Sequence, residues 1–194
     1  MSQMMFLNIA TFVPSYLLED DKGKLRDISV AEFSVVLAMY NTARLLLSTT
    51  IGKSMNKVGR KNFIIIGFIL MIISTIGFGA LDYIPVTPKE TMKWVFFSGA
   101  IICRLIQGVA GTILQVAGQT IMLGEYRGRK EKGLAYLSAA RGLGFLGGPI
   151  LGQGLYSEIK YKPTFLVFGI LLGVSLVFTY FMLPGRLNID PTKS

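Results

Sequence analysis

Long apolar runs follow one another along the chain and are separated by short polar stretches. A helix that crosses a bilayer needs about 20 predominantly apolar residues, and most of the runs reach that length. The run at 62–81 contains no charged residue, and the run at 94–124 is interrupted only by Arg104. The pattern predicts six membrane-spanning helices, at about 4–18, 31–51, 62–81, 94–124, 133–156 and 164–183.

The first run is shorter than a complete span. Residues 4–18 are only about 15 in number and include Pro14, and at roughly 1.5 Å per residue they fall short of the hydrocarbon core. A signal peptide is the alternative interpretation. However, no Lys or Arg precedes the run and no small-residue cleavage site is evident. We therefore interpret it as a transmembrane helix that lacks its first turns.

Composition supports a membrane protein and removes several kinds of site. Of 194 residues, 52% are hydrophobic and 16% are charged, whereas a soluble domain carries roughly 25% charged residues. There is no His and one Cys, so we expect no His-based or Cys-cluster metal site and no disulfide framework. No Ser/His/Asp, Cys/His or paired-carboxylate site can be assembled, so we expect no enzyme. The predicted fold is all-α and polytopic, a six-helix bundle over 1–185 with a cytoplasmic tail over 186–194.

The net charge of +9 is concentrated in two of the predicted loops. Cytoplasmic loops of membrane proteins carry an excess of Lys and Arg, so we expect these two loops, and both termini, to face the cytoplasm. The excess charge therefore follows from topology, and we expect no nucleic-acid partner. The basic residues of the two loops are Lys53, Lys57, Arg60, Lys61, Arg127, Arg129, Lys130 and Lys132.

Several polar residues lie inside the predicted spans. Arg104, Gln107 and Gln115 share one face of the fourth span at helical spacing. A charged side chain in lipid is costly and should face the bundle interior or a watery cavity, and packing alone does not require a cation. We therefore expect these three to line a substrate cavity, with Arg141 and Asn41 as weaker candidates. Arg44 either lines the same cavity or extends toward the membrane interface near Gly52.

The connection between the second and third spans carries a recognisable pattern. Gly52-Lys53-Ser54-Met55-Asn56-Lys57-Val58-Gly59-Arg60-Lys61 resembles the signature loop between helices 2 and 3 of the major facilitator superfamily. Gly52, Gly59, Arg60 and Lys61 match that pattern, Lys57 is a conservative match, and Asn56 stands where the family has Asp. The alternative is an ordinary basic loop with permissive glycines. The resemblance implies a gate loop whose contacts lock one transport state.

Two further stretches are similar to motifs of the same family. Arg104-Leu105-Ile106-Gln107-Gly108 looks like the family's helix-4 motif, Arg-x-x-Gln-Gly, whose Arg is associated with substrate or proton handling. In the fifth span, Gly144, Gly148, Pro149 and Gly152 are similar to the motif of the superfamily's antiporters. Glycine at every fourth position also opens a groove for close helix packing, which explains this repeat without transport.

The resemblance implies the N-terminal six-helix half of a secondary transporter of a small solute, antiporter-like and without a cofactor. Since the family transports between two such halves, we expect a second half or a homodimer partner, in addition to membrane lipid. Every Asp and Glu lies outside the spans or at their ends. Either a second half supplies the partner of the arginines, or the solute is anionic, or ion coupling does not reside in this half. The alternative function is a degenerate half-transporter that serves as a structural subunit of a larger membrane assembly.

Overall fold

The structure is a bundle of long helices, with no β-strand among the residues described. It is a computed structural model, which describes residues 9–11, 13, 14, 16, 28–85, 89–126, 128–159 and 161–185. Its elements are α3 (Val30–Val58), α4 (Arg60–Ala80), the 3₁₀ helix η1 (Leu81–Tyr83), α5 (Lys89–Glu125), α6 (Lys130–Ile159) and α7 (Tyr161–Met182). Five helices, α3 to α7, are long and apolar enough to cross a membrane. The prediction of an all-α polytopic membrane protein is confirmed.

The predicted first span lies largely outside the described residues. Of 4–18, only residues 9–11, 13, 14 and 16 are described, and these are helical. Ile9, Val13 and Tyr16 are buried in a hydrophobic cluster that also contains residues of α3 to α7. The predicted tail at 186–194 lies outside the described residues as well, so the six-span count stays a prediction.

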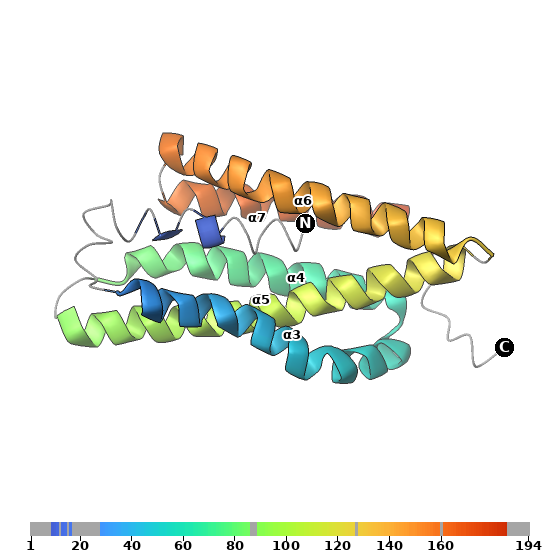
Figure 1. The fold of residues 1–194 in the computed structure, drawn as a ribbon, viewed down its shortest axis with the longest axis horizontal. Coiled ribbons are helices and arrows are strands. Elements are labelled where there is room, and N and C mark those ends of the chain that lie inside the picture. Colours follow the sequence, from blue (N-terminus) through green and yellow to red (C-terminus); the bar gives the residue numbers. More distant parts are fainter. Residues whose placement is uncertain are drawn as a thin grey trace.

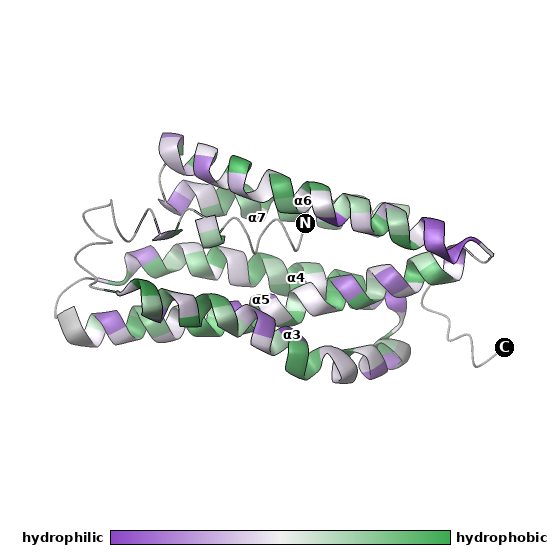
Figure 2. Ribbon diagram, in the orientation of Figure 1, coloured by the Kyte–Doolittle hydropathy of each residue, from purple (hydrophilic) through white to green (hydrophobic). Residues whose placement is uncertain are grey.

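Helix α5 forms the centre of the bundle (Figure 1). It packs extensively against both α3 and α4, and α4 packs in turn against α7. Helix α6 lies at the outside and makes much less contact, with α5 and α7. Hydrophilic residues gather toward the helix ends, most densely around the turn between α5 and α6, while the middle of the bundle is largely apolar (Figure 2). This pattern is the one expected of helices embedded in lipid.

The connection between α3 and α4 is much shorter than the sequence suggested. We expected a loop from Gly52 to Lys61, but α3 continues to Val58 and α4 begins at Arg60, so that Gly59 alone separates them. Hydropathy marks where an apolar segment ends, whereas a helix continues into water as long as its backbone is hydrogen-bonded. Gly59 has φ 88° and ψ 146°, and its N–H donates to the carbonyl oxygen of Met55 at 3.0 Å.

The opposite end of α3 is fixed by a capping box. The Ser29 hydroxyl oxygen accepts from the Glu32 N–H at 3.1 Å, and the Ser29 N–H donates to the Glu32 carboxylate at 2.7 Å. Glu32 also pairs with Lys93, near the start of α5, at 3.0 Å. These bonds satisfy backbone donors that a helix start leaves open and set the beginnings of α3 and α5 next to each other.

Helix α5 is longer than the apolar core of a bilayer. Its 37 residues correspond to about 55 Å at 1.5 Å per residue, against roughly 30 Å of hydrocarbon. A helix of this length must tilt or project beyond the hydrocarbon core. It contacts η1 toward one end of the bundle and, at Gly124, approaches Arg60 toward the other.

The backbones of α3 and α5 approach closely at two glycines. A Cβ at Gly108 would lie 2.5 Å from the carbonyl oxygen of Tyr40 and 2.9 Å from the Cβ of Ala43. A Cβ at Gly111 would lie 2.6 Å from the Tyr40 hydroxyl. Small residues at a membrane helix interface let backbones approach in this way. The two glycines therefore permit close packing of α5 against α3, at the Tyr40 backbone for Gly108 and at the Tyr40 side chain for Gly111.

We expect Gly59→Ala to destabilise the chain, because its backbone conformation is one that side-chain-bearing residues rarely adopt. The cost is of order 1–3 kcal/mol. Gly52→Ala is the matched control, since Gly52 is helical and a Cβ there meets nothing within 4 Å. Thermal unfolding of the purified variants in detergent measures the difference. Equal melting temperatures for the two variants would contradict the assigned turn.

Gly108→Ala should weaken the contact between α3 and α5, because the added methyl group meets a backbone carbonyl that cannot move alone. Overpacking of this kind costs about 1–3 kcal/mol. Gly118→Ala, in the same helix, is the control, since the nearest atom to its Cβ is Leu137 Cδ1 at 3.9 Å. Unfolding in detergent should show a loss of stability for Gly108→Ala only, and a loss of the same size in both variants would refute the close approach.

Candidate functional site

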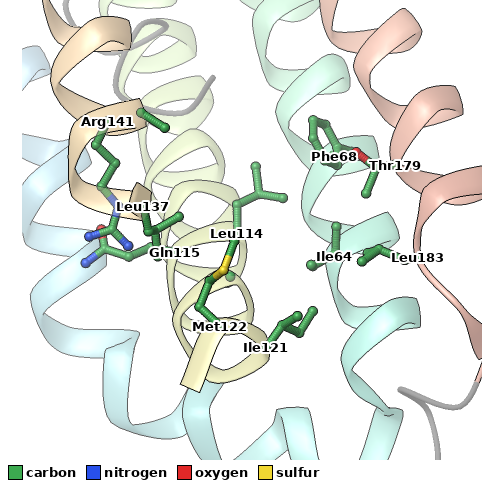
Figure 3. Close-up of a pocket in the computed structure, with 12 residues that line it drawn as sticks. Ile64, Phe68, Leu114, Gln115, Ile121, Met122, Leu137, Arg141, Thr179 and Leu183 are labelled. Carbon is green, nitrogen blue, oxygen red and sulfur yellow. The ribbon is translucent and has the colours of Figure 1, made fainter. Parts of the chain in front are cut away.

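Three helices contribute polar side chains to one cluster near the middle of the bundle. Arg44 of α3 donates from Nη2 to the Gln115 side-chain oxygen of α5, and its guanidinium carbon lies 5.4 Å from the centre of the Tyr40 ring. Arg141 of α6 lies beside Gln115, and its guanidinium is directed toward that amide (Figure 3). Gln115 therefore stands between two cations that come from helices on either side of α5.

Two cavities meet at Gln115. The cavity that we call the Arg44 cavity has a volume of about 460 Å³, and its polar lining comprises Asn41, Arg44, Ser48, Thr112 and Gln115. The second, the Arg141 cavity, has a volume of about 330 Å³ and lies among α4, α5, α6 and α7. Gln115 and Arg141 lie on one side of it, and Phe68, Ile64 and Leu183 lie across from them (Figure 3).

The cluster is strongly cationic in its surroundings. Among the side chains that the structure describes, none that lines either cavity is acidic. The acidic side chains that the structure describes all lie in or beside the terminal turns of helices, namely Glu32, Asp82, Glu125, Glu131 and Glu158. Arg141 Nη2 is buried and has no hydrogen-bond acceptor among the described residues. Such a group is costly unless an acceptor reaches it.

Arg104 and Gln107 lie deeper than the two cavities. Both side chains are buried, with Arg104 at 0% exposure, and neither belongs to the lining of the Arg44 or the Arg141 cavity. Arg104 donates to the Gln107 side-chain oxygen at 2.9 Å, and Gln107 donates to the Thr75 hydroxyl of α4 at 3.4 Å. The Arg104 guanidinium carbon lies 5.6 Å from the centre of the Phe78 ring. The three residues that helical spacing puts on one face therefore have different surroundings. Arg104 and Gln107 form an interior pair, whereas Gln115 lines both cavities.

The candidate gate residues lie around the turn at Gly59. Gly52, Asn56 and Lys57 are in the last turns of α3, and Arg60 and Lys61 open α4. A Cβ at Gly124 would lie 3.1 Å from Arg60 Nη1, so this guanidinium reaches the end of α5. Lys61 Nζ lies 4.6 Å from the centre of the Tyr180 ring of α7. The two cations therefore join the turn to two other helices at the same end.

The glycine repeat of α6 is only partly covered by other helices. Gly148 and Gly152 are buried, and Pro149 lies within the helix, whereas Gly144 is half-buried. Most of the remaining face of α6 is exposed and apolar. A proline removes one backbone hydrogen bond and favours a bend. The repeat follows Leu137, Ala140 and Arg141, the residues through which α6 lines the Arg141 cavity.

A second polar cluster surrounds Asp82 at the other end of the bundle, and little in the sequence indicates it. Tyr16 donates to the Asp82 carboxylate at 2.8 Å, and Lys162 Nζ lies 3.2 Å from its second oxygen. Lys162 also lies 3.8 Å from the centre of the Tyr83 ring. Asp82 sits in η1, after the apolar span, and its side chain is buried. The only available signal was a lone acid at a span end, which does not reveal burial.

The described part of the chain contains no set of side chains that could bind a metal ion. There, no group of three His, Cys, Asp or Glu side chains lies close enough to hold an ion. The arrangement at Gln115 instead offers hydrogen-bond donors and positive charge, which suit an acceptor-rich or anionic group.

Comparison with known proteins identifies several curated relatives of the chain. It is 28% identical over 149 residues to Tetracycline resistance protein, class B, of Escherichia coli, which covers 77% of this chain and 34% of that protein. It is 28% identical over 187 residues to the Synaptic vesicular amine transporter of Homo sapiens, covering 95% and 34%. With MFS-type transporter SLC18B1 of Mus musculus it shares 25% identity over 160 residues, covering 82% and 34%.

The chain spans about a third of the length of these curated relatives. A family profile described as Major Facilitator Superfamily matches residues 1–193. That match covers nearly every residue of the helical bundle and includes the motifs at Gly52–Lys61, at Arg104–Gly108 and at Gly144–Gly152. The chain belongs to the Major Facilitator Superfamily.

Proposed function

We propose that this chain forms the N-terminal six-helix half of a secondary transporter that moves a small solute across a membrane. The observation that carries the proposal is the meeting of Arg44, Gln115 and Arg141, from three helices, at two cavities inside an apolar bundle. An intramembrane cation is costly, by roughly 2.5–3.5 kcal/mol on insertion scales. Two of them beside one amide are best explained by a ligand that they bind.

The charge of the site favours an anionic solute. The names of two relatives refer to tetracycline and to amines, and these names describe those proteins. In this chain, Arg44 and Arg141 would repel a cation, and no described acidic side chain lines their cavities. Asn41 extends the polar wall of the Arg44 cavity. Arg104 and Gln107 lie behind this wall and, in this proposal, hold α4 and α5 in the orientation that presents Gln115.

The transport cycle would use the turn at Gly59 and the glycines of α6. By the positive-inside rule, the two basic turns favour a cytoplasmic location for the Gly59 end of the bundle, and the proposal puts both termini on that side. Arg60 and Lys61, through their contacts with α5 and α7, form the cytoplasmic gate. The buried Gly148 and Gly152, with Pro149 between them, allow α6 to bend, as an antiporter-like cycle requires.

A second six-helix half, or a second copy of this chain, would complete the path. Transporters of this architecture bind their solute between two repeats near the bilayer midplane. Side chains of α3 and α6 that flank the polar cluster are exposed, including Leu45, Leu46 and Leu143. We propose that the partner half covers this face and closes the Arg44 cavity from the other side.

The test is solute uptake by the natural assembly. The chain is tagged in its own cells, purified with everything that remains bound, and reconstituted into liposomes. Radiolabelled benzoate and succinate serve as anions, tetraethylammonium as a cation and glucose as a neutral solute. Saturable uptake of an anion supports the proposed function. Stable incorporation without flux of any probe would instead support the structural-subunit role.

In the transporting assembly, Arg44→Gln and Arg141→Gln should each raise KM for the anion about tenfold or more. A hydrogen bond to a charged group contributes about 1.5–3 kcal/mol, and 1.4 kcal/mol corresponds to tenfold in affinity. Arg129→Gln is the control, because Arg129 is an exposed cation just before α6. Initial-rate uptake measures all three variants. An unchanged KM in both site variants, or an equal change in Arg129→Gln, would sink the assigned site.

A further inference from the structure

The Arg141 cavity has one polar end and one apolar end. Arg141 and Gln115 form the polar end, and Phe68, Leu114 and Ile121 contribute to the rest of the wall (Figure 3). Thr179, across the cavity, is the third polar residue of the described lining. Its hydroxyl donates to the Ser175 carbonyl oxygen of its own helix at 2.6 Å. The donors that remain available are therefore confined to one end.

The polar end of the cavity offers a ligand many hydrogen-bond donors and few hydrogen-bond acceptors. Arg44 donates to the side-chain oxygen of Gln115, so one of the two lone pairs of this oxygen is already used. In the opposite orientation, the Gln115 NH₂ group would face the Arg44 guanidinium. Both groups are donors, so this orientation is excluded. The amide therefore turns its NH₂ group away from Arg44. Arg141 adds a guanidinium, which has donors only, and its buried Nη2 lacks an acceptor in the described part of the chain.

The cationic, donor-rich end of the cavity and its apolar wall together define a class of ligand. A carboxylate or sulfonate accepts from Arg141 and Gln115, and an aliphatic or aromatic body removes the apolar wall from contact with water. We infer that the Arg141 cavity binds a small amphipathic organic anion, with its anionic head at Arg141 and Gln115 and its apolar body against Phe68, Leu114 and Ile121. This inference rests on the proposed function and names the class of solute.

The size of the cavity favours a small solute over a membrane lipid. Its volume of about 330 Å³ lies at the lower end of the roughly 300–1,000 Å³ of small-molecule pockets. One ring or a short chain fits such a space, whereas a phospholipid with two acyl chains does not. A cation is disfavoured by Arg141, and a neutral molecule leaves the guanidinium without a charged acceptor.

Photolabelling of the full chain in nanodiscs of phosphatidylcholine tests the inference. The probe is benzoate with a para trifluoromethyl-diazirine, and the matched probes are the corresponding benzyl alcohol and benzylamine. Mass spectrometry locates the labelled residues. We expect the benzoate probe to label cavity residues such as Met122 and Leu137 about tenfold more than the alcohol or the amine. Soluble naphthalene-2-sulfonate should displace it.

Two variants and one control separate the two ends of the cavity. Arg141→Gln should lower labelling by the benzoate to the level of the alcohol. Gly118→Leu should lower labelling by all probes, because its side chain grows into the cavity from a position with free space around the Cβ. Arg129→Gln, which removes an exposed cation outside the cavity, should leave labelling unchanged. Thermal unfolding in the same discs verifies that each variant is folded.

Three results would overturn the inference. The first is equal labelling by the benzoate and the alcohol, and the second is undiminished labelling of folded Arg141→Gln. The third is displacement by added phosphatidylglycerol and not by naphthalene-2-sulfonate, which would assign the cavity to a lipid headgroup. Uptake is measured in parallel on the natural assembly reconstituted into liposomes. Labelling without uptake keeps the binding site and refutes transport, whereas saturable uptake of succinate without labelling keeps transport and refutes the amphipathic class.

Discussion

The cost of placing a cation in the membrane organises this bundle more than any other constraint. Arg44, Arg104 and Arg141 lie away from the ends of their helices, in the apolar region, and each must find partners that replace water. Arg104 finds them in the interior, at Gln107 and over the Phe78 ring. Arg44 finds them at Gln115 and over the Tyr40 ring. Arg141 stands at a cavity, where a partner from outside the chain can reach it.

Close backbone packing is what brings these partners together. The side chains of Arg44 and Gln115 meet because α3 and α5 are held against each other, and the approach at Gly108 leaves no room for a Cβ beside Tyr40. Helix α6, by contrast, contacts its neighbours sparsely, so Arg141 is not locked in the same way. The rigid α3–α5 pair thus supplies a fixed amide, and the looser helix supplies a cation that can respond to a ligand.

Much of this arrangement was predictable from the sequence, and the features that were not predicted have physical reasons. Apolar runs indicated the helices because lipid selects for composition, but they misjudged the turn at Gly59, since a helix does not stop where its apolar residues stop. Helical spacing grouped Arg104 with Gln115 on one face. It did not reveal that α4 covers the first of them, because the position of a neighbouring helix is not encoded in the spacing along one helix. Asp82 was overlooked for the same reason.

The difference between Arg104 and Arg141 supports the proposed position of the binding site. Arg104 is fully buried, and its bond to Gln107 joins α5 to Thr75 of α4. Arg141 is half-buried at a cavity, its Nη2 finds no acceptor among the described residues, and its helix packs sparsely against its neighbours. In the proposed function, the empty site is tolerated because Arg141 is only half-buried, and an anion would supply the acceptor that its Nη2 lacks among the described residues. The same charge would then attract the solute to the contact between α6 and α5.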